Sequence, residues 1–255
     1  MLRLVTIPIS HYCEKARWAL QRAGLDYREE PHVQGLHRLY ARRAGGGLTV
    51  PVLVTPEGAI GESEQILEWV DARTEPGRRL FGEGAEREEE LAVSRRLDER
   101  LGPHGRRLIY VRMFEQPQLM LRFNDQGVPR WEDRALRVGL PVARHFIARV
   151  LDIRPGVERE DEEIVFAELD WVAAQLADGR PYLLGERFSS ADLTFAALAA
   201  PIVLPPVYGV PLPPIELLDA TSADLVERGR AHPAGAFALR LYGERAQDAA
   251  APAAA

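Results

Sequence analysis

Strand-type and helix-type patterns alternate at the start of the chain. Apolar residues alternate over residues 2–9, which predicts a short strand that runs into a turn at Ser10. Good helix formers with apolar residues on one face fill Tyr12–Ala23, and Gly24 is a natural end for the helix predicted there. A second strand is predicted around Tyr27. The chain therefore opens as strand, helix, strand.

The next pattern predicts a loop, a hairpin and a helix. Residues 28–47 are polar and arginine-rich and end in three glycines, so we expect a mobile loop there. Strands are predicted at residues 52–54 and 59–61 around a turn at residues 56–58. A helix is expected from Ser63 to about Arg73. This order is that of a thioredoxin-like domain, expected over residues 1–76.

Only helical patterns follow a polar segment at residues 77–86, which we interpret as a linker. An all-helical domain is expected over residues 87–247. Two of its helices are indicated by apolar faces at helical spacing, one with Val142, Phe146, Val150 and Ile153, and one with Val165, Leu169, Val172 and Leu176.

Three segments of the helical domain have their own signals. Ser189 with Asp192 three residues later has the pattern of a capping box before a buried, alanine-rich helix, so both residues are expected to be structural. Long connections are expected near Phe123 to Trp131 and in the proline-rich stretch after Pro201. Residues 248–255 have little to bury and are expected to form a disordered tail.

Composition and charge narrow the function classes. The 255 residues have a formal net charge of -6 with scattered cations, which argues against a nucleic-acid partner. No apolar stretch reaches the ~18 residues that a membrane helix needs. Cys13 is the single cysteine, so an internal disulfide is excluded and a cytoplasmic protein is expected.

Several kinds of catalytic site have no signature in the sequence. The six histidines show no metal-ligand spacing, so no metal site is expected. A glycine-rich phosphate loop and a Gly-x-Ser-x-Gly nucleophile turn are also missing.

Four phrases in order resemble the cytosolic glutathione transferases. Ser10-His11-Tyr12-Cys13-Glu14-Lys15-Ala16-Arg17 is similar to the strand-to-helix turn of serine-type members, with a spacing like that of the plant tau class. The other three phrases are Thr49-Val50-Pro51-Val52, Gly61-Glu62-Ser63-Glu64 and Phe188-Ser189-Ser190-Ala191-Asp192. The chain is identified on these phrases as a bacterial-type member of the superfamily, and the resemblance implies the two-domain fold.

The resemblance also implies a glutathione site in the first domain. Ser10 would activate the glutathione thiol, because donors at a helix N-terminus lower the pKa of a thiol. Pro51 would follow a cis peptide bond that aims the backbone of Val50 at the cysteinyl part of glutathione. Ser63 would cap the next helix and, with Glu62, bind the γ-glutamyl end.

Other site residues follow from the same resemblance. Tyr12 is expected to contact glutathione and to border a pocket for the second substrate between the domains. That pocket is expected to include Arg107, Tyr110, Phe114 and Tyr208. Cys13 is expected to be a buried structural residue, and Arg17 to form a structural ion pair with a buried carboxylate.

The expected function is a glutathione transferase that directs the glutathione thiolate at a small electrophile, in conjugation and detoxification. Isomerisation, dehalogenation or peroxide reduction would use the same thiolate. Two alternatives stay open: a non-catalytic binding or scaffold protein with this fold, and a monothiol reductase that uses Cys13. The family implies a homodimer. The segment before Pro51 lacks the family's basic residue, so Arg42, Arg43 or His37 could bind the glycyl carboxylate instead.

Overall fold

A four-stranded mixed sheet forms the centre of the first domain. The computed structural model describes residues 1–250, with side chains to residue 247. The strand order is β2-β1-β3-β4, where β1 (Leu2–Thr6) is parallel to β2 (Tyr27–Pro31) and antiparallel to β3 (Val52–Thr55), and β4 (Gly58–Ile60) is antiparallel to β3. This confirms the thioredoxin-like domain that the sequence predicts.

Three helices flank the sheet. They are α1 (His11–Arg22), α2 (His37–Ala44) and α3 (Ser63–Asp71). The prediction of a mobile loop before the three glycines is wrong, because β2 extends to Pro31 and α2 occupies His37–Ala44 of that stretch. Ala41 of α2 packs in a small core with Val5 and Val52, and this burial holds the arginine-rich segment in place.

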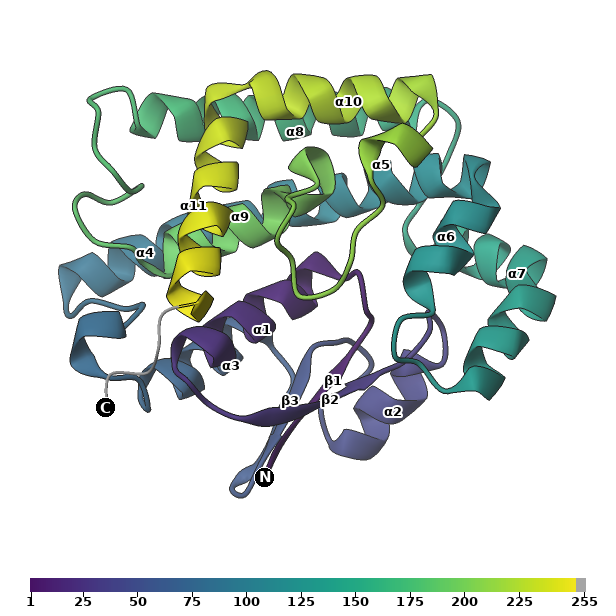
Figure 1. The fold of residues 1–255 in the computed structure, drawn as a ribbon, viewed down its shortest axis with the longest axis horizontal. Helices are drawn as coiled ribbons and strands as arrows, with labels where there is room; N and C mark the ends of the chain where they lie inside the picture. Colours follow the sequence, from purple (N-terminus) through teal and green to yellow (C-terminus); the bar gives the residue numbers. More distant parts are fainter. Residues whose placement is uncertain (251–255) are drawn as a thin grey trace.

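The second domain contains only helices among the described residues, as predicted (Figure 1). Its elements are η1 (Pro76–Arg78), α4 (Ala85–Glu99), α5 (Leu101–Glu115), α6 (Pro117–Asn124), α7 (Arg130–Val150), α8 (Val157–Gln175), α9 (Ser190–Val203), η2 (Ile215–Leu217), α10 (Ala220–Ala231) and α11 (Pro233–Ala250). The segment predicted as a linker, residues 77–86, overlaps η1 at one end and the start of α4 at the other.

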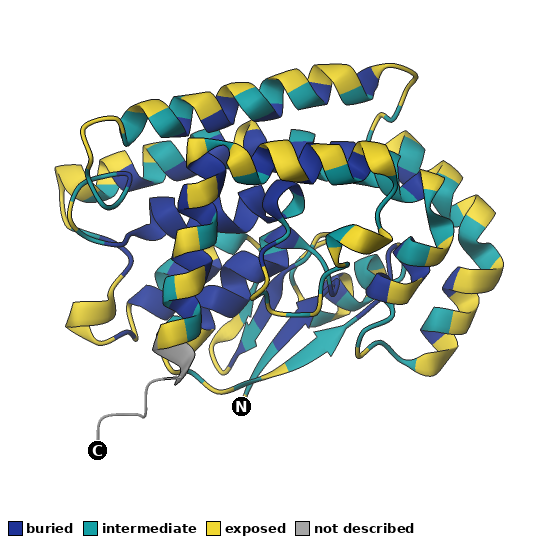
Figure 2. Cartoon of the chain, turned by 45° about the horizontal axis from the view of Figure 1, so that its top comes forward, coloured by how far each residue is buried: buried dark blue, intermediate teal, exposed yellow. Residues whose placement is uncertain are grey.

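Helix α9 is the centre of the hydrophobic core. It packs against α1 of the first domain and against α4, α5, α10 and α11, and in Figure 2 it is one of the most continuously buried elements. Asp192 accepts hydrogen bonds from Ser189 N and from Leu183 N, both at 2.8 Å. The predicted capping box is therefore present, and one core joins the two domains.

Helices α6 and α7 form a hairpin that lies beside α2 (Figure 1). Leu121 and Leu136 of the hairpin pack with Val33, which follows β2. The connection predicted at residues 123–131 is shorter than expected and spans residues 125–129.

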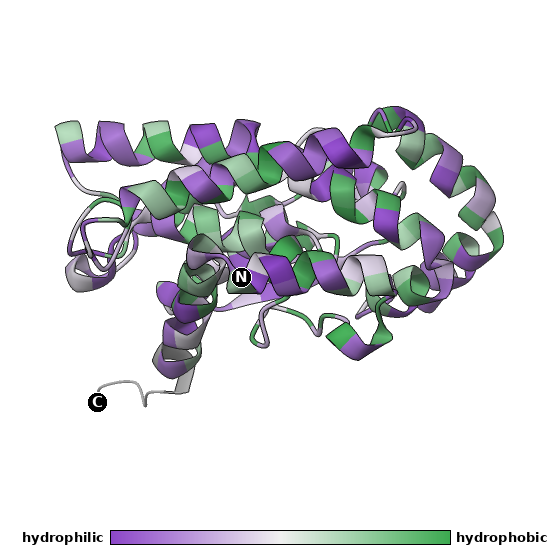
Figure 3. Ribbon diagram, turned by 90° about the horizontal axis from the view of Figure 1, so that it is seen from above, coloured by the Kyte–Doolittle hydropathy of each residue, from purple (hydrophilic) through white to green (hydrophobic). Residues whose placement is uncertain are grey.

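The apolar face predicted around Val142 is not a core face. Val142 is 75% exposed and Val150 is 54% exposed, because the inner side of α7 is formed by Leu136, Leu140 and Ile147. In Figure 3, which colours the ribbon by hydropathy, the outer helices carry both hydrophilic and hydrophobic segments.

The proline-rich stretch after α9 is a fixed connection over the start of α1. Gly209 N donates to both carboxylate oxygens of Glu14, at 3.0 and 3.1 Å. A side chain at this position would have no room, since a Cβ on Gly209 would lie 2.4 Å from Arg17 Cδ. At the other end of the chain, α11 runs to Ala250, and the rest of the tail predicted from residue 248 lies outside the described residues.

Candidate functional site

Ser10 is the N-cap residue of helix α1 and ends the short turn that follows β1. Its backbone is extended, with φ -68° and ψ 122°, and its Oγ accepts a hydrogen bond from Cys13 N at 3.4 Å. The side chain is half-buried and lines a cavity. A helix N-terminus concentrates partial positive charge from unpaired N–H groups. This corner of the cavity is therefore suited to an anionic atom.

Cys13 lies behind Ser10 and faces the protein interior. Its side chain is fully buried, and burial raises the pKa of its thiol. A neutral, inaccessible thiol is a poor nucleophile. This placement agrees with the expected structural role.

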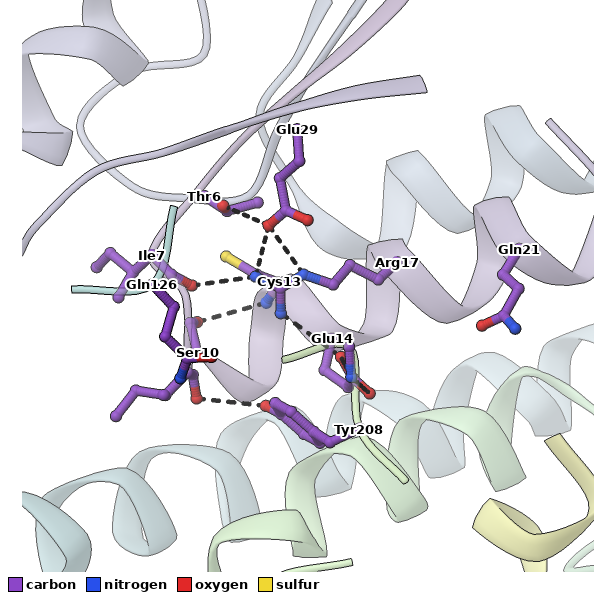
Figure 4. A network of polar contacts seen from close by, with 12 residues as sticks. Thr6, Ile7, Ser10, Cys13, Glu14, Arg17, Gln21, Glu29, Gln126 and Tyr208 are labelled. Carbon is purple, nitrogen blue, oxygen red and sulfur yellow. Dashed lines mark hydrogen bonds and ion pairs between the residues drawn. The ribbon is translucent and has the colours of Figure 1, made fainter. Parts of the chain in front are cut away.

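A buried network of charges fixes α1 against the sheet (Figure 4). Arg17 donates from Nε and Nη2 to Glu29 Oε1 at 2.9 and 2.7 Å, and Thr6 Oγ1 donates to the same oxygen at 2.7 Å. Arg17 thus forms the ion pair that the sequence predicts. Its carboxylate partner is on β2 and is a quarter exposed.

Glu14 ties α1 to the distal end of the chain. Its carboxylate is fully buried and pairs with Arg245 of α11 as well as with Arg17 Nη1 at 3.5 Å. Because the connection after α9 also donates to Glu14, the position of the Ser10 turn depends on residues about 200 positions away.

The peptide bond between Val50 and Pro51 is cis, as the resemblance implied. Val50 and Thr49 line the same cavity as Ser10, whereas Pro51 is buried beneath them. Ser10 and the backbone before Pro51 therefore border one space.

Glu62 and Ser63 stand apart from this cavity. Neither lines it, and Glu62 is exposed. The prediction that Ser63 caps α3 is wrong: Ser63 is the first residue of the helix, and Glu62 is the N-cap residue, without a side-chain cap. Glu62 O accepts from Ile66 N at 2.9 Å, which is the first helical hydrogen bond.

The cavity has a volume of about 300 Å³ and is lined by both domains. The first domain contributes the turn before α1, the start of α2 and the segment before Pro51. The second domain contributes one face of α5, the α6–α7 hairpin, the end of α9 and the proline-rich connection. Most of the lining side chains are apolar, so an apolar molecule would be shielded from water there.

Two of the four residues expected in the second-substrate pocket line the cavity. Tyr110 does so from α5, and Tyr208 does so from the proline-rich connection. Tyr12 borders the same space, and its hydroxyl donates to Asp98 O at 3.3 Å.

Arg107 and Phe114 do not line the cavity, and these two expectations are corrected. Arg107 points to the other side of α5, where Nε and Nη2 each donate to Asp161 at 2.7 Å. Phe114 is a core residue that packs with Met120 and Ile147. The register of α5 turns both positions away from the residues at 106, 109, 110 and 113.

The sequence interpretation missed three arginines and one histidine of the lining, which are Arg38, Arg106, Arg112 and His11. His37, which was named as a candidate for the glycyl carboxylate, does line the cavity. Arg106 is four residues before Tyr110 and shares its helix face, so the spacing could have revealed it. Arg38 lies on α2, which the sequence interpretation did not predict. Arg42 and Arg43, proposed instead, are exposed and lie outside the lining.

The ionisable rings of the lining are uncharged near neutral pH. Burial, followed by the charge of Arg106, lowers the pKa of His11 to about 3, and burial lowers the pKa of His37 to about 4. Burial raises the pKa of Tyr12, Tyr110 and Tyr208. The cations of the cavity are therefore its arginines, and the tyrosine hydroxyls keep their protons.

Within residues 1–250 no helix is both long and apolar enough to cross a membrane. No three side chains of the metal-binding types gather at one point in the same part of the chain.

Family models match two segments of the chain. The family model described as the N-terminal domain of glutathione S-transferase matches residues 4–78. The model described as the glutathione S-transferase C-terminal domain matches residues 154–225. Helices α4 to α7 lie between the matched segments. No curated protein matches the chain by sequence.

Solved glutathione transferases share the fold along nearly the whole chain. Glutathione transferase F7 from Populus trichocarpa is 14% identical, with a TM-score of 0.62 over 98% of this chain and 99% of that chain. A glutathione S-transferase from Xanthobacter autotrophicus Py2 is 19% identical, with a TM-score of 0.60 over 94% and 92%. One from Methylobacillus flagellatus KT, solved with glutathione bound, is 15% identical, with a TM-score of 0.59 over 96% and 98%.

Proposed function

This chain belongs to the glutathione transferase superfamily, and we propose that it is a glutathione transferase-type enzyme in which Ser10 stabilises the glutathione thiolate. The observation that supports this most directly is the position of Ser10. It caps α1 while its side chain lines a largely apolar cavity that also contains Val50, the residue before the cis bond.

The turn at Ser10 supplies the electrostatics that such a reaction needs. A thiol with an ordinary pKa near 8.5 is mostly protonated at neutral pH, and a helix N-terminus with a hydroxyl donor lowers that value. The Ser10 hydroxyl would donate to the sulfur, and the first N–H groups of α1 would add favourable potential. The thiolate would then form a carbon–sulfur bond to an electrophile held in the cavity, and the leaving group would depart with the electron pair.

The backbone before the cis bond would hold the cysteinyl part of glutathione, beside Tyr12. Arg38 is the cation that we assign to the glycyl carboxylate, since it lines the same cavity as Val50 whereas Arg42 and Arg43 do not. Glu62 and Ser63 at the start of α3 would take the γ-glutamyl end, outside the cavity proper.

The fully buried Cys13 disfavours the monothiol reductase reading. One observation favours a non-catalytic binding protein as the second candidate: Glu62 and Ser63 are separated from the cavity, and Glu62 is exposed. That protein would keep the fold and the cavity without aligning glutathione at Ser10. A cytoplasmic homodimer is part of the leading proposal on family grounds.

Calorimetric titration with glutathione tests the proposal. The wild type, Ser10→Ala, Arg38→Met and the exposed control Arg43→Met would be compared, each with its melting temperature. We expect wild type, Ser10→Ala and Arg43→Met to bind alike, and Arg38→Met to bind at least about tenfold more weakly because a charged hydrogen bond is lost. Absence of binding by a folded wild type would reject the enzyme and favour the second candidate.

A further inference from the structure

Arg106 and Arg112 differ from most buried or half-buried arginines of this protein. Arg17, Arg96 and Arg107 illustrate the common arrangement, in which the guanidinium is paired with a carboxylate at 2.7 to 2.8 Å. Arg106 and Arg112 line the cavity and make no ion pair with any residue in the described part of the chain. The Nε of each is buried and has no hydrogen-bond partner there.

The walls of the cavity supply no compensating negative charge. No aspartate or glutamate is among the lining residues, and the tyrosines there remain protonated. Asp98, whose backbone oxygen accepts from the Tyr12 hydroxyl, already has its carboxylate paired with Lys15 Nζ at 2.8 and 2.9 Å. Shielded cations without a counter-ion are costly, and a bound carboxylate would remove that cost through charge-assisted hydrogen bonds.

The rest of the space is suited to an apolar body. The apolar lining comes from three places. Ile109 and Met113 line the cavity from α5, the helix that also carries the two arginines, Phe123 and Phe146 line it from the α6–α7 hairpin, and Leu204 lines it just after α9. A volume of about 300 Å³ is in the range of cavities that hold small organic molecules.

The two arginines cover both ends of such a body. Arg106 is next to the reactive corner, with its guanidinium carbon 5.8 Å from the centroid of the Tyr12 ring. Arg112 is six residues further along α5, a rise of about 9 Å. An anionic group at the far end of a ligand would thus meet Arg112 while the opposite end approached Ser10, and Arg106 would attract the ligand from the reactive side.

We propose that the second substrate of this enzyme is an amphipathic carboxylate, an electrophile whose apolar body fills the cavity and whose carboxylate is bound by Arg112, while Arg106 attracts the ligand from the reactive side. The inference rests on the proposed function, since it names the substrate class of that site. It assigns the α5 arginines to the second substrate and leaves the carboxylates of glutathione to Arg38 and α3.

The test uses a matched pair of ligands that bind without reacting. Naphthalene carboxylate and naphthalene carboxamide have the same shape and differ in charge. Calorimetry would measure each with wild type, Arg106→Met, Arg112→Met, the two corresponding Arg→Lys variants, and Arg134→Met as a control for loss of one exposed charge. Melting temperatures would confirm folding, and Arg112→Met and the lysine variants keep the test valid if Arg106→Met does not fold.

We expect wild type to bind the carboxylate about tenfold or more tightly than the carboxamide. Arg112→Met should lose about tenfold in carboxylate affinity, since a charged hydrogen bond is removed, and Arg106→Met should lose a smaller part of it. Both variants should keep their carboxamide affinity because the apolar contacts stay. The lysine variants should keep part of the preference, and Arg134→Met all of it. Equal binding of the two ligands by wild type, or equal weakening of both in the variants, would overturn the inference.

Titration of the same variants with glutathione separates this inference from the proposed function. Unchanged glutathione affinity in Arg106→Met and Arg112→Met supports the assignment to the second substrate. A loss of glutathione affinity with an unchanged carboxylate preference overturns it. If wild type prefers the carboxylate and does not bind glutathione, the anion site stands and the enzyme proposal fails.

A catalytic arm would then compare a chloronitrobenzoate with the matching chloronitrobenzamide as substrates. A higher kcat/KM for the acid in wild type, reduced in the arginine variants, supports the proposal. Each kcat/KM is divided by the rate of the same compound with free glutathione, because the amide is the more reactive ring, and a normalised value that favours the amide in wild type would contradict the proposal.

Discussion

The hydroxyl of Tyr208 donates a hydrogen bond to the backbone oxygen of Ile9 at 3.3 Å. This contact joins the proline-rich connection to the residue before Ser10, and both partners line the cavity. The wall of the cavity and the turn at its reactive corner are therefore one connected structure, although 199 positions separate the two residues in sequence.

Tyr208→Phe should lower the free energy of unfolding by about 1 kcal/mol, because the ring stays while one hydrogen bond is lost. Urea unfolding would measure it. Tyr242→Phe is the control, since the buried Tyr242 hydroxyl has no hydrogen-bond partner among the described residues. Equal losses in the two variants would show that the bond to Ile9 contributes nothing.

Glu132 should anchor the α6–α7 hairpin over the cavity. Its fully buried carboxylate lies 2.8 Å from His32 Nδ1 and accepts from Val33 N at 3.2 Å. Glu132→Ala leaves these buried groups without an acceptor, so a loss of about 2–3 kcal/mol is expected.

Asp133→Ala is the matched control for Glu132→Ala, because Asp133 pairs with Arg137 on the exposed side of α7. A surface pair contributes at most about 1 kcal/mol. Urea unfolding and amide hydrogen exchange of residues 117–150 would compare the two variants. The anchoring role is refuted if hydrogen exchange of the hairpin is the same in both.

Cys13 should resist alkylation in the native protein. The side chain is inaccessible and burial raises the pKa of the thiol, so the reactive thiolate is scarce and shielded. Iodoacetamide at pH 8 should modify the protein in urea and leave the native protein unmodified, as measured by intact mass. Rapid labelling of the native form would revive the reductase interpretation.

Stability should fall as pH drops below about 6.5, in part because of His11. The pKa of His11 is lowered from 6.5 to about 3 by burial and then by Arg106 and Lys15. Between these values the unfolded chain binds a proton that the folded chain does not, so the stability present above pH 6.5 is lost towards pH 3. The slope from this group is up to ~1.4 kcal/mol per pH unit.

Urea unfolding of wild type and His11→Asn between pH 7 and pH 5 would isolate this contribution. The variant should show a shallower decline than wild type. Parallel declines would mean that His11 takes up its proton without unfolding.

Local signals in the sequence predict the fold well where one short segment decides the structure. The alternating apolar residues before Ser10 predict strand β1, and the run of helix formers after Ser10 predicts helix α1. The Ser189–Asp192 pair predicts the start of α9. The structure confirms all three elements. Helix α2 was missed because its stability comes from Ala41 packing on Val5 and Val52, residues of two different strands. Such a tertiary contact leaves no periodic pattern in eight residues.

The same contrast between local sequence signals and tertiary contacts holds for the candidate site. The helix start after Ser10 follows from a local sequence pattern, whereas the cis bond after Val50 was implied only by the family resemblance, and the structure contains both. The choice between Arg106 and Arg107 depends on how α5 is rotated about its axis, and Asp161, 54 residues away, is what draws Arg107 to the other side. The long α7 face around Val142 has the spacing of a core helix, yet only the packing of the whole hairpin decides which side is covered.

A pH titration of the thiolate absorbance of bound glutathione tests the central claim most directly. In wild type saturated with glutathione, the thiolate band should appear with a midpoint roughly one or more pH units below that of free glutathione. In Ser10→Ala with equal occupancy, the midpoint should move back towards the free value. A bound thiol with the same depressed pKa in both proteins, or with an undepressed pKa in wild type, would contradict the role of Ser10.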